Sequence, residues 1–184
     1  FEKEFEMIGN ALSVNSDNVE SLNRMWLCVE LNEKYEESIQ LHTELINKNP
    51  YSYLAWYNLA HAYCGLKLYE KAIDAFGYVI AIDEDFEDAY CDLAEAFICL
   101  GKYREAIDYL LKVAEISKPY EELYYQIGYC FEKLKKFSKA REYYRLSVRM
   151  DPFYHEAYYR MGETYRKEKR FNNAINAYKK AVKF

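Results

Sequence analysis

Residues 53–86 read YLAWYNLAHAYCGLKLYEKAIDAFGYVIAIDEDF. The first half places apolar residues three or four positions apart, as in Trp56, Leu59 and Tyr63, and the second half does the same with Ala72 and Phe76. This spacing puts the apolar side chains on one face of an α-helix. The stretch therefore predicts two amphipathic helices joined by a short turn.

The same pattern recurs along the whole chain at one fixed spacing, that from Tyr35 to Tyr69. Each predicted second helix begins with an aromatic residue and has a small residue three positions later, at Tyr35/Ser38, Tyr69/Ala72, Tyr103/Ala106, Phe137/Ala140 and Phe171/Ala174. Each predicted first helix has two apolar residues three positions apart and, in four of five cases, a small residue next, at Leu22/Met25/Trp26, Trp56/Leu59/Ala60, Tyr90/Leu93/Ala94, Tyr124/Ile127/Gly128 and Tyr158/Met161/Gly162. A fixed period of about 34 residues indicates stacked helical hairpins.

These residues resemble the tetratricopeptide repeat, most closely in residues 53–86 and 155–184. The resemblance covers the whole chain and implies an all-α fold, a right-handed solenoid of antiparallel helix hairpins wound into an α-α superhelix. It implies one solenoid domain over residues 1–184. Residues 1–18 form the second helix of a partial repeat, with Phe1 aligned to Tyr35. Full repeats follow at 19–52, 53–86, 87–120 and 121–154, and a nearly complete one at 155–184.

Prolines support these boundaries, and two residues of the first full repeat depart from the pattern. Pro50 and Pro152 stand at the closing position of their repeats and Pro119 one place later, where a residue without an amide hydrogen ends one helix and starts the next. Trp26 stands where a small residue is expected, and His42 where an aromatic residue or Leu is usual. We expect this repeat to pack at a different angle.

The composition fits a helical domain with a substantial core. Hydrophobic residues make up 51% of the chain, with only three prolines and six glycines. The five cysteines, at 28, 64, 91, 99 and 130, form no CxxC pair, which favours reduced thiols and a cytoplasmic location. No apolar run approaches the roughly 18 residues of a membrane span, so no membrane association is predicted. The chain begins at Phe1, which leaves a removed signal or an upstream region open.

Charge is unevenly distributed along the chain, whose formal net charge is −5. Residues 121–184 carry 15 Lys and Arg against 8 Asp and Glu, a net charge of +7, which leaves −12 for residues 1–120. Such polarity affects steering and self-association rather than the fold.

In the tetratricopeptide family the first helix of each hairpin lines a concave groove that holds peptides. Carried over residue by residue, the resemblance implies that the candidate peptide-binding residues are Tyr57, Asn58, His61, Asp88, Asp92, Glu95, Tyr125, Tyr129, Tyr159, Glu163 and Arg166. Tyrosine rings bordered by carboxylates would favour a partner with Lys or Arg set between apolar anchors, through cation-π contacts and charge pairing. The competing interpretation is that these tyrosines serve packing and these carboxylates are solvated.

Other chemistry is not indicated. The sequence has no Gly-rich phosphate loop, GxSxG, HExxH or CxxC motif, so no enzyme activity, cofactor or metal is predicted. A soft metal could be held by His61, Cys64, Cys91 and Glu95. The same residue types are also expected in a groove that binds no metal, which is the interpretation we adopt. Asp88 and Asp92 stand where relatives that grip a chaperone's terminal carboxylate need Lys or Asn, so no such clamp is predicted. The pI near 5.4 argues against nucleic acid as a partner.

The sequence therefore predicts a protein-interaction scaffold or adaptor. Two alternatives stay open: a substrate-recruiting or regulatory region of a larger enzyme, and a structural solenoid that self-assembles through its end helices. The last predicted helix presents Ile175, Tyr178 and Val182 where a further hairpin would dock.

Overall fold

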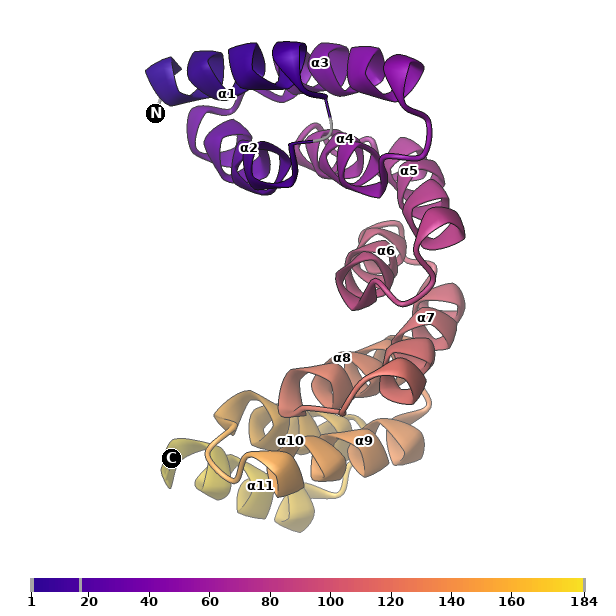
Figure 1. Cartoon of the computed structure of the whole chain (residues 1–184). Coiled ribbons are helices and arrows are strands. Elements are labelled where there is room, and N and C mark those ends of the chain that lie inside the picture. Colours follow the sequence, from indigo (N-terminus) through magenta and orange to yellow (C-terminus); the bar gives the residue numbers. More distant parts are fainter. Residues whose placement is uncertain (1, 17, 184) are drawn as a thin grey trace. The chain divides into compact units, whose positions relative to one another are not determined.

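The computed structural model describes residues 2–16 and 18–183, and this part of the chain consists of α-helices joined by short turns, without a strand (Figure 1). The helices are α1 (Glu2–Val14), α2 (Val19–Asn32), α3 (Tyr35–Lys48), α4 (Tyr53–Gly65), α5 (Tyr69–Ile82), α6 (Glu87–Cys99), α7 (Tyr103–Ile116), α8 (Glu121–Lys133), α9 (Phe137–Met150), α10 (His155–Lys167) and α11 (Phe171–Lys183). The predicted all-α fold of successive hairpins is confirmed. The alignment of Phe1 lies outside the described residues.

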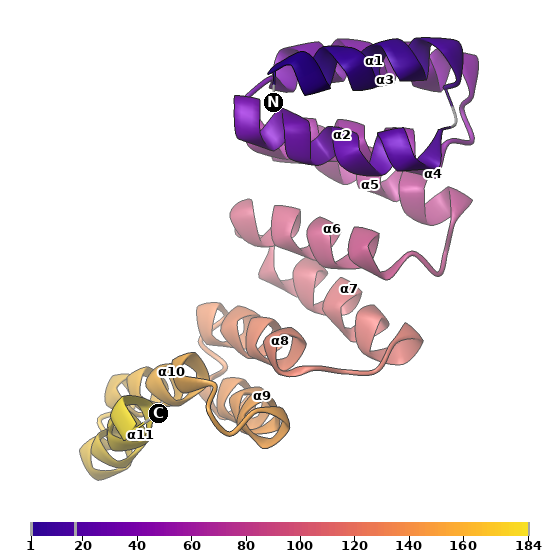
Figure 2. The same cartoon turned by 60° about the vertical axis from the view of Figure 1, so that its left-hand side comes forward.

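The chain divides into two compact units, which we describe separately. The N-terminal unit, Phe1–Leu100, contains α1 to α6, and the C-terminal unit, Gly101–Phe184, contains α7 to α11. Within the first, α2 packs against α1 and α4, α4 against α3 and α5, and α5 against α6. Within the second, α7 to α11 pack each on the next, as Figure 2 shows from a second direction. Within the described residues, no helix is long and apolar enough to cross a lipid bilayer.

Turns between paired helices share one backbone device. A residue with positive φ recurs once in each repeat, at Glu33, Lys67, Gly101, Lys135 and Lys169, with φ between 53° and 73°. After α4, the Lys67 amide donates to the Cys64 carbonyl over 2.9 Å, and the Leu68 amide donates to the Tyr63 carbonyl over 2.8 Å. These bonds satisfy the last carbonyls of the helix while the left-handed residue reverses the chain. The left-handed backbone conformation therefore recurs at the same spacing as the sequence repeat.

Close helix approach depends on the small residue near the middle of each first helix. A Cβ atom placed on Gly128 of α8 would lie 2.7 Å from the ring of Tyr144 and 3.2 Å from the carbonyl oxygen of Ala140, both on α9. Tyr144 is fully buried, so it has no room to move away. On α10, a Cβ atom at Gly162 would overlap the ring of Tyr178. At Gly128 and Gly162, the small residue predicted from the repeat is thus the site where an aromatic ring of the neighbouring helix lies against the backbone.

The first full repeat is the exception. Trp26 replaces the small residue, and α2 touches α3 at far fewer points than α4 touches α5. The Trp26 side chain is 40% exposed, whereas His42 of α3 is fully buried. The Nδ1 atom of His42 lies 2.8 Å from the carbonyl oxygen of Ser38, and Nε2 has no hydrogen-bond partner among the described residues. The expected difference in packing of this repeat shows in the sparse contact between α2 and α3, and the Trp26 ring lies beside that of His61 on α4.

We predict that Gly128→Ala lowers the stability of the chain by roughly 1 to 3 kcal/mol, because a methyl group would overlap a buried ring. Gly77→Ala is the matched control, since a Cβ atom at that helical glycine meets nothing within 4 Å. It should leave stability unchanged or raise it by up to roughly 1 kcal/mol. Guanidinium chloride unfolding followed by circular dichroism measures both. Equal midpoints for the two variants would contradict the steric account.

We predict a pH-dependent loss of stability from His42. Burial lowers its pKa from 6.5 to about 4, so the folded state binds the proton less readily than the unfolded state. Because His42 stays neutral in the folded chain, the free energy of unfolding has its full value above pH 6.5. As the pH falls toward 4, protonation of His42 in the unfolded chain lowers that free energy by roughly 3 kcal/mol at most. His42→Leu should flatten the dependence of the unfolding midpoint between pH 7 and pH 5. The exposed His155, changed to Leu, serves as the control, and an unchanged slope in His42→Leu would refute this assignment.

Candidate functional site

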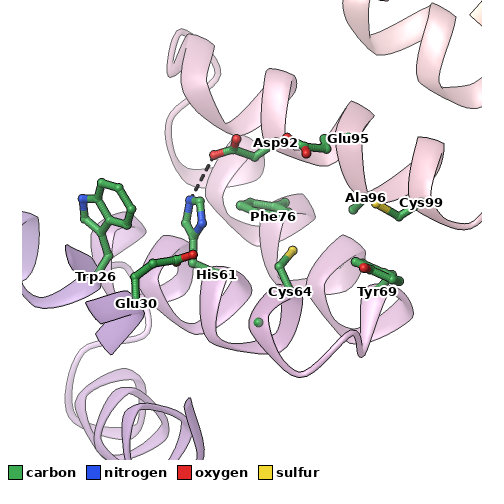
Figure 3. A pocket seen from close by; sticks show the side chains of 11 residues that line it. Trp26, Glu30, His61, Cys64, Tyr69, Phe76, Asp92, Glu95, Ala96 and Cys99 are labelled. Atoms are coloured by element: carbon green, nitrogen blue, oxygen red, sulfur yellow. Dashed lines mark ion pairs between the residues drawn. The ribbon is translucent and has the colours of Figure 1, made fainter. Parts of the chain in front are cut away.

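Two adjoining hollows lie on the N-terminal unit where α2, α4 and α6 face one another. They measure about 350 and 410 Å³ and share Trp26, His61 and Asp92. Figure 3 shows the side chains that line the first of them. The first is also lined by Glu30, Cys64, Gly65, Tyr69, Phe76, Glu95, Ala96 and Cys99, and the second by Asn23, Leu54, Tyr57, Asn58, Phe86 and Asp88. We call this surface the acidic aromatic groove.

Asp92 is the centre of the groove. Its Oδ2 atom accepts a hydrogen bond from the Tyr57 hydroxyl over 2.5 Å and lies 3.0 Å from Nε2 of His61. Burial, followed by the charge of Asp92, raises the pKa of Tyr57, which therefore remains a hydroxyl donor. The Tyr57 ring also meets His61 and Phe86 edge-on, with centroid separations of 4.5 and 5.0 Å. These contacts hold one carboxylate of α6 against two rings of α4.

Aromatic rings form the walls. The Trp26 ring lies 5.8 Å from His61, and Phe76 lies 5.6 Å from His61 on another side. Figure 3 shows Trp26 and Glu30 of α2 across from Asp92 of α6, with His61 between them. Sequence reasoning did not name Trp26, Glu30 or Phe76 as groove residues. The signal was present for two of them: Trp26 breaks the small-residue rule, and Glu30 stands one repeat before Cys64, itself in the carried-over groove register.

The predicted groove residues of the N-terminal unit do not all have the same role. Asn58 is 3% exposed, and its side-chain amide donates to the carbonyl oxygen of Leu22 over 2.8 Å, which ties α4 to α2. Asp88 lines the groove, where burial and then the neighbouring Asp92 and Glu87 raise its pKa. Glu95 lines the other hollow. The groove thus crowds carboxylates whose mutual repulsion a cation would relieve.

The N-terminal unit is strongly acidic as a whole. It contains 6 Lys and Arg against 19 Asp and Glu, a net charge of −13. Among the described residues that line the two hollows there is no Lys or Arg. A cleft lined by one sign of charge concentrates ligands of the opposite sign. The electrostatic field and the local side chains therefore favour the same class of ligand.

The tyrosines of the C-terminal unit already have cationic neighbours. Arg160 Nε donates to the Tyr125 hydroxyl over 3.4 Å, and the Arg160 guanidinium lies 5.2 Å from the centroid of Tyr129. Lys133 lies over the same ring at 4.9 Å. Tyr159 is 52% exposed and lies 5.8 Å from Tyr178. The chain's own cations bind the Tyr125 hydroxyl and the Tyr129 ring, whereas Tyr159 presents half of its surface to solvent.

A buried carboxylate organises these cations. Glu132 is 4% exposed, and its oxygens accept from the Tyr144 hydroxyl at 2.8 Å and from Lys167 Nζ at 2.7 Å. Arg160 is 4.0 Å away. A buried charge is costly unless it is paired and hydrogen-bonded, and here it has both kinds of partner. Glu132 therefore links α8, α9 and α10.

Glu163 and Arg166 form a closed pair on α10. Arg166 donates twice to the Glu163 carboxylate, over 2.6 and 3.1 Å, and the Tyr178 hydroxyl donates to it over 2.5 Å. The Arg166 hydrogen bonds, followed by that of Tyr178, lower the pKa of Glu163 to about 2. Both predicted residues are thus engaged with each other. They lie in a different unit from the acidic aromatic groove, so the predicted row of rings through Tyr57, Tyr125 and Tyr159 stays a prediction.

The geometry does not favour a metal. Across residues 2–16 and 18–183, no group of three or more His, Cys, Asp or Glu side chains is arranged to hold an ion. Burial, followed by Asp92 and other anions, raises the pKa of Cys64 to about 12. A thiol must lose its proton to bind a metal, and this environment opposes that loss.

We predict that Glu163 stays ionised down to a pH of about 2, because two donors stabilise its carboxylate. Carbon-13 NMR of the side-chain carboxyl group during an acid titration measures this directly. Arg166→Gln should move the midpoint up toward the ordinary range near 4.3. The spectrum of Glu156, on the same helix, provides the internal control. A Glu163 midpoint unaffected by Arg166→Gln would show that the ion pair does not form.

Several solved protein structures have a fold similar to that of this chain. The crystal structure of MamA has a TM-score of 0.79 at 21% identity, over 86% of this chain and 93% of that one. The structure described as YrrB, a TPR protein with an unusual peptide-binding site, has a TM-score of 0.78 at 18% identity, over 96% and 91%. MamA from Desulfovibrio magneticus RS-1, residues 41 to the end, has a TM-score of 0.80 at 16% identity, over 91% and 94%. At these identities the likeness shows the fold alone.

The comparison with protein families is more specific, whereas no curated protein sequence matched the chain. The sequence model described as the tetratricopeptide repeat protein 21 C-terminal ARM domain matches residues 5–184. Together with the fold neighbours, this match confirms the tetratricopeptide-type repeat inferred from the period of the sequence. The chain belongs to the family of tetratricopeptide repeat protein 21 C-terminal ARM domains.

Proposed function

We propose that this chain is a protein-interaction scaffold whose acidic aromatic groove holds a partner segment presenting an Arg or Lys side chain beside an apolar one. The observation that carries the proposal is the pairing of Trp26, His61 and Asp92 at the junction of two hollows lined by carboxylates and rings. A guanidinium or ammonium group there would meet carboxylates at its edge and π-faces on its sides.

The C-terminal unit supplies an internal precedent for this contact. Arg160 lies over the Tyr129 ring and within 4.0 Å of the Glu132 carboxylate, so one cation meets a ring and an anion together. The acidic aromatic groove has rings and carboxylates but no cation of its own among the described lining residues. A partner's side chain would complete the same arrangement.

Two further features support binding of an extended segment. The paired hollows adjoin, which gives room for a cationic side chain in one and an apolar side chain in the other. Tyr57 and Phe86 offer an apolar surface beside Asp88 in the second hollow. We also propose a reducing, cytoplasmic-type compartment, because the five cysteines form no disulfide with one another in the described part of the chain.

The test uses two fluorescein-labelled peptides in which Leu alternates with either Arg or citrulline, which keeps the shape of Arg but is neutral. We predict that the Arg peptide binds the full chain and the citrulline peptide binds at least roughly tenfold more weakly, as expected for loss of charge-assisted hydrogen bonds. Fluorescence anisotropy measures binding. In a Trp56→Phe background, the emission of Trp26 should change on binding, because this indole lines both hollows.

Matched variants locate the site. The double substitution Glu30→Gln and Asp92→Asn should lower the affinity for the Arg peptide by roughly tenfold or more. Glu36→Gln with Glu37→Gln changes the net charge equally on α3, outside the groove, and should have little effect. Equal losses in the two double variants would mean non-specific attraction to an acidic protein. Equal affinity for the Arg and citrulline peptides would refute the cation site.

A further inference from the structure

A third hollow lies on the C-terminal unit among α9, α10 and α11, with a volume of about 350 Å³. Its lining residues are Arg145, Val148, Tyr158, Met161, Tyr165, Asn173, Asn176, Ala177 and Lys180. We call it the α9–α11 cleft. Its floor is apolar and aromatic, and its polar groups are two cations and two carboxamides.

The α9–α11 cleft is not part of the predicted peptide groove. Tyr158, Met161 and Tyr165 of α10 line it. The predicted groove residues of the same helix are Tyr159, Glu163 and Arg166. At about 100° per residue these two sets lie on different sides of α10. An occupant of the cleft would therefore leave the groove-facing side of α10 free.

The cleft is open where two positions that carry a ring in some earlier repeats hold other residues. Ala177 corresponds, one repeat on, to Tyr143, whose ring stacks on Phe131 at 5.4 Å and fills the same position in the preceding hairpin. Lys180 corresponds to Tyr78 of the N-terminal unit, whose ring stacks on Trp56 at 4.3 Å. With a methyl group and a flexible cation in these places, no aromatic pair fills the cleft.

The polar side chains of the α9–α11 cleft suit an anion. Asn176 stands where the earlier second helices have Asp74 and Glu142, so the carboxylate of those repeats is replaced by an amide that can donate. Arg145 donates to the Tyr165 hydroxyl over 3.1 Å, and Lys180 lies 5.7 Å from the Tyr158 ring. In the described part of the chain, no carboxylate pairs with either cation, and none lines the cleft.

Charge on the larger scale favours the same ligand. The C-terminal unit carries 19 Lys and Arg against 11 Asp and Glu, a net charge of +8. Long-range attraction would therefore steer an acidic partner toward the unit, and Arg145 and Lys180 would hold it. The apolar floor distinguishes this site from a bare basic patch, because it also requires a non-polar side chain next to the anion.

We propose that the α9–α11 cleft binds an acidic segment of a partner protein. An Asp or Glu carboxylate is held by Arg145 and Lys180, with Asn173 and Asn176 as further donors, and a neighbouring apolar side chain packs on Tyr158, Met161 and Tyr165. This site is separate from the acidic aromatic groove and takes a ligand of opposite charge. It does not depend on the function proposed above.

The experiment titrates the full chain with a labelled peptide in which Leu is flanked by Glu residues, and with its Gln counterpart. We predict binding of the Glu peptide and at least roughly tenfold weaker binding of the Gln peptide. In proton–nitrogen NMR spectra the largest shifts should fall on the side-chain amides of Asn173 and Asn176. Shifts confined to other residues, or equal binding of the two peptides, would overturn the proposal.

Variants test the cleft itself. The double substitution Arg145→Gln with Lys180→Gln should lower the affinity for the Glu peptide by roughly tenfold or more. Arg149→Gln with Lys179→Gln removes the same charge from exposed positions of α9 and α11 outside the cleft, and should bind as the native chain does. Lys180→Tyr restores the ring found at Tyr78 and should close the site without changing helicity. Equal losses of affinity in the two double variants would show that binding depends on overall charge and not on the cleft, and would overturn the proposal.

Two other occupants are distinguished in the same series. A single-stranded RNA that binds more tightly than the Glu peptide and competes with it would overturn the proposal in favour of a phosphate site. The other occupant is the acidic N-terminal unit of a second copy. Sedimentation over a dilution series detects it as a dimer that Arg145→Gln with Lys180→Gln dissociates. A dimer of this kind, together with no binding of the Glu peptide, would also overturn the proposal that a separate partner protein binds the cleft.

Discussion

The contact between a small residue on one helix and an aromatic ring on its neighbour is the interaction on which the rest of this structure depends. Gly128 beneath Tyr144 and Gly162 beneath Tyr178 leave no space for a Cβ atom, so in these two hairpins the helices approach closely because the sequence provides that pairing. The two pairings lie one repeat apart, and the corresponding pair in residues 53–86 is Ala60 with Phe76. A hairpin of this kind cannot bury its apolar face alone, so stacking follows.

The candidate sites arise where the repeat departs from this rule. Trp26 occupies a small-residue position and places an indole beside His61 in the acidic aromatic groove. Ala177 and Lys180 stand in the last hairpin where Tyr143 and Tyr78 place rings in two other hairpins, and the α9–α11 cleft lies beside them. In both places the residues that stabilise stacking elsewhere are absent, and a surface that can receive another molecule takes their place. Packing and recognition therefore compete for the same repeat positions.

Charge separates the two units further. In the N-terminal unit, burial and then the neighbouring Asp92 raise the pKa of Asp88, and the lining residues supply no compensating Lys or Arg. In the C-terminal unit, the carboxylates Glu132 and Glu163 are each bound by neighbouring cations and tyrosine hydroxyls. The same residue types thus form an acidic surface without Lys or Arg in one unit and carboxylate–cation networks in the other. This difference in charge is the basis on which we propose ligands of opposite charge for the two units.

The sequence by itself determined the period, the helix pairs and the positions of close approach. These follow from local rules, since apolar spacing and turn geometry act within a few residues. It also predicted that Tyr57, His61 and Asp92 share a groove, because the repeat register places them on the same side of successive first helices. Only the tertiary structure decided what each side chain does there. Asn58 bonds to Leu22, Tyr57 to Asp92 and Lys167 to Glu132, and each pair is 35 or 36 residues apart. Such contacts depend on side-chain direction and on the spacing between neighbouring helices, which periodicity does not specify.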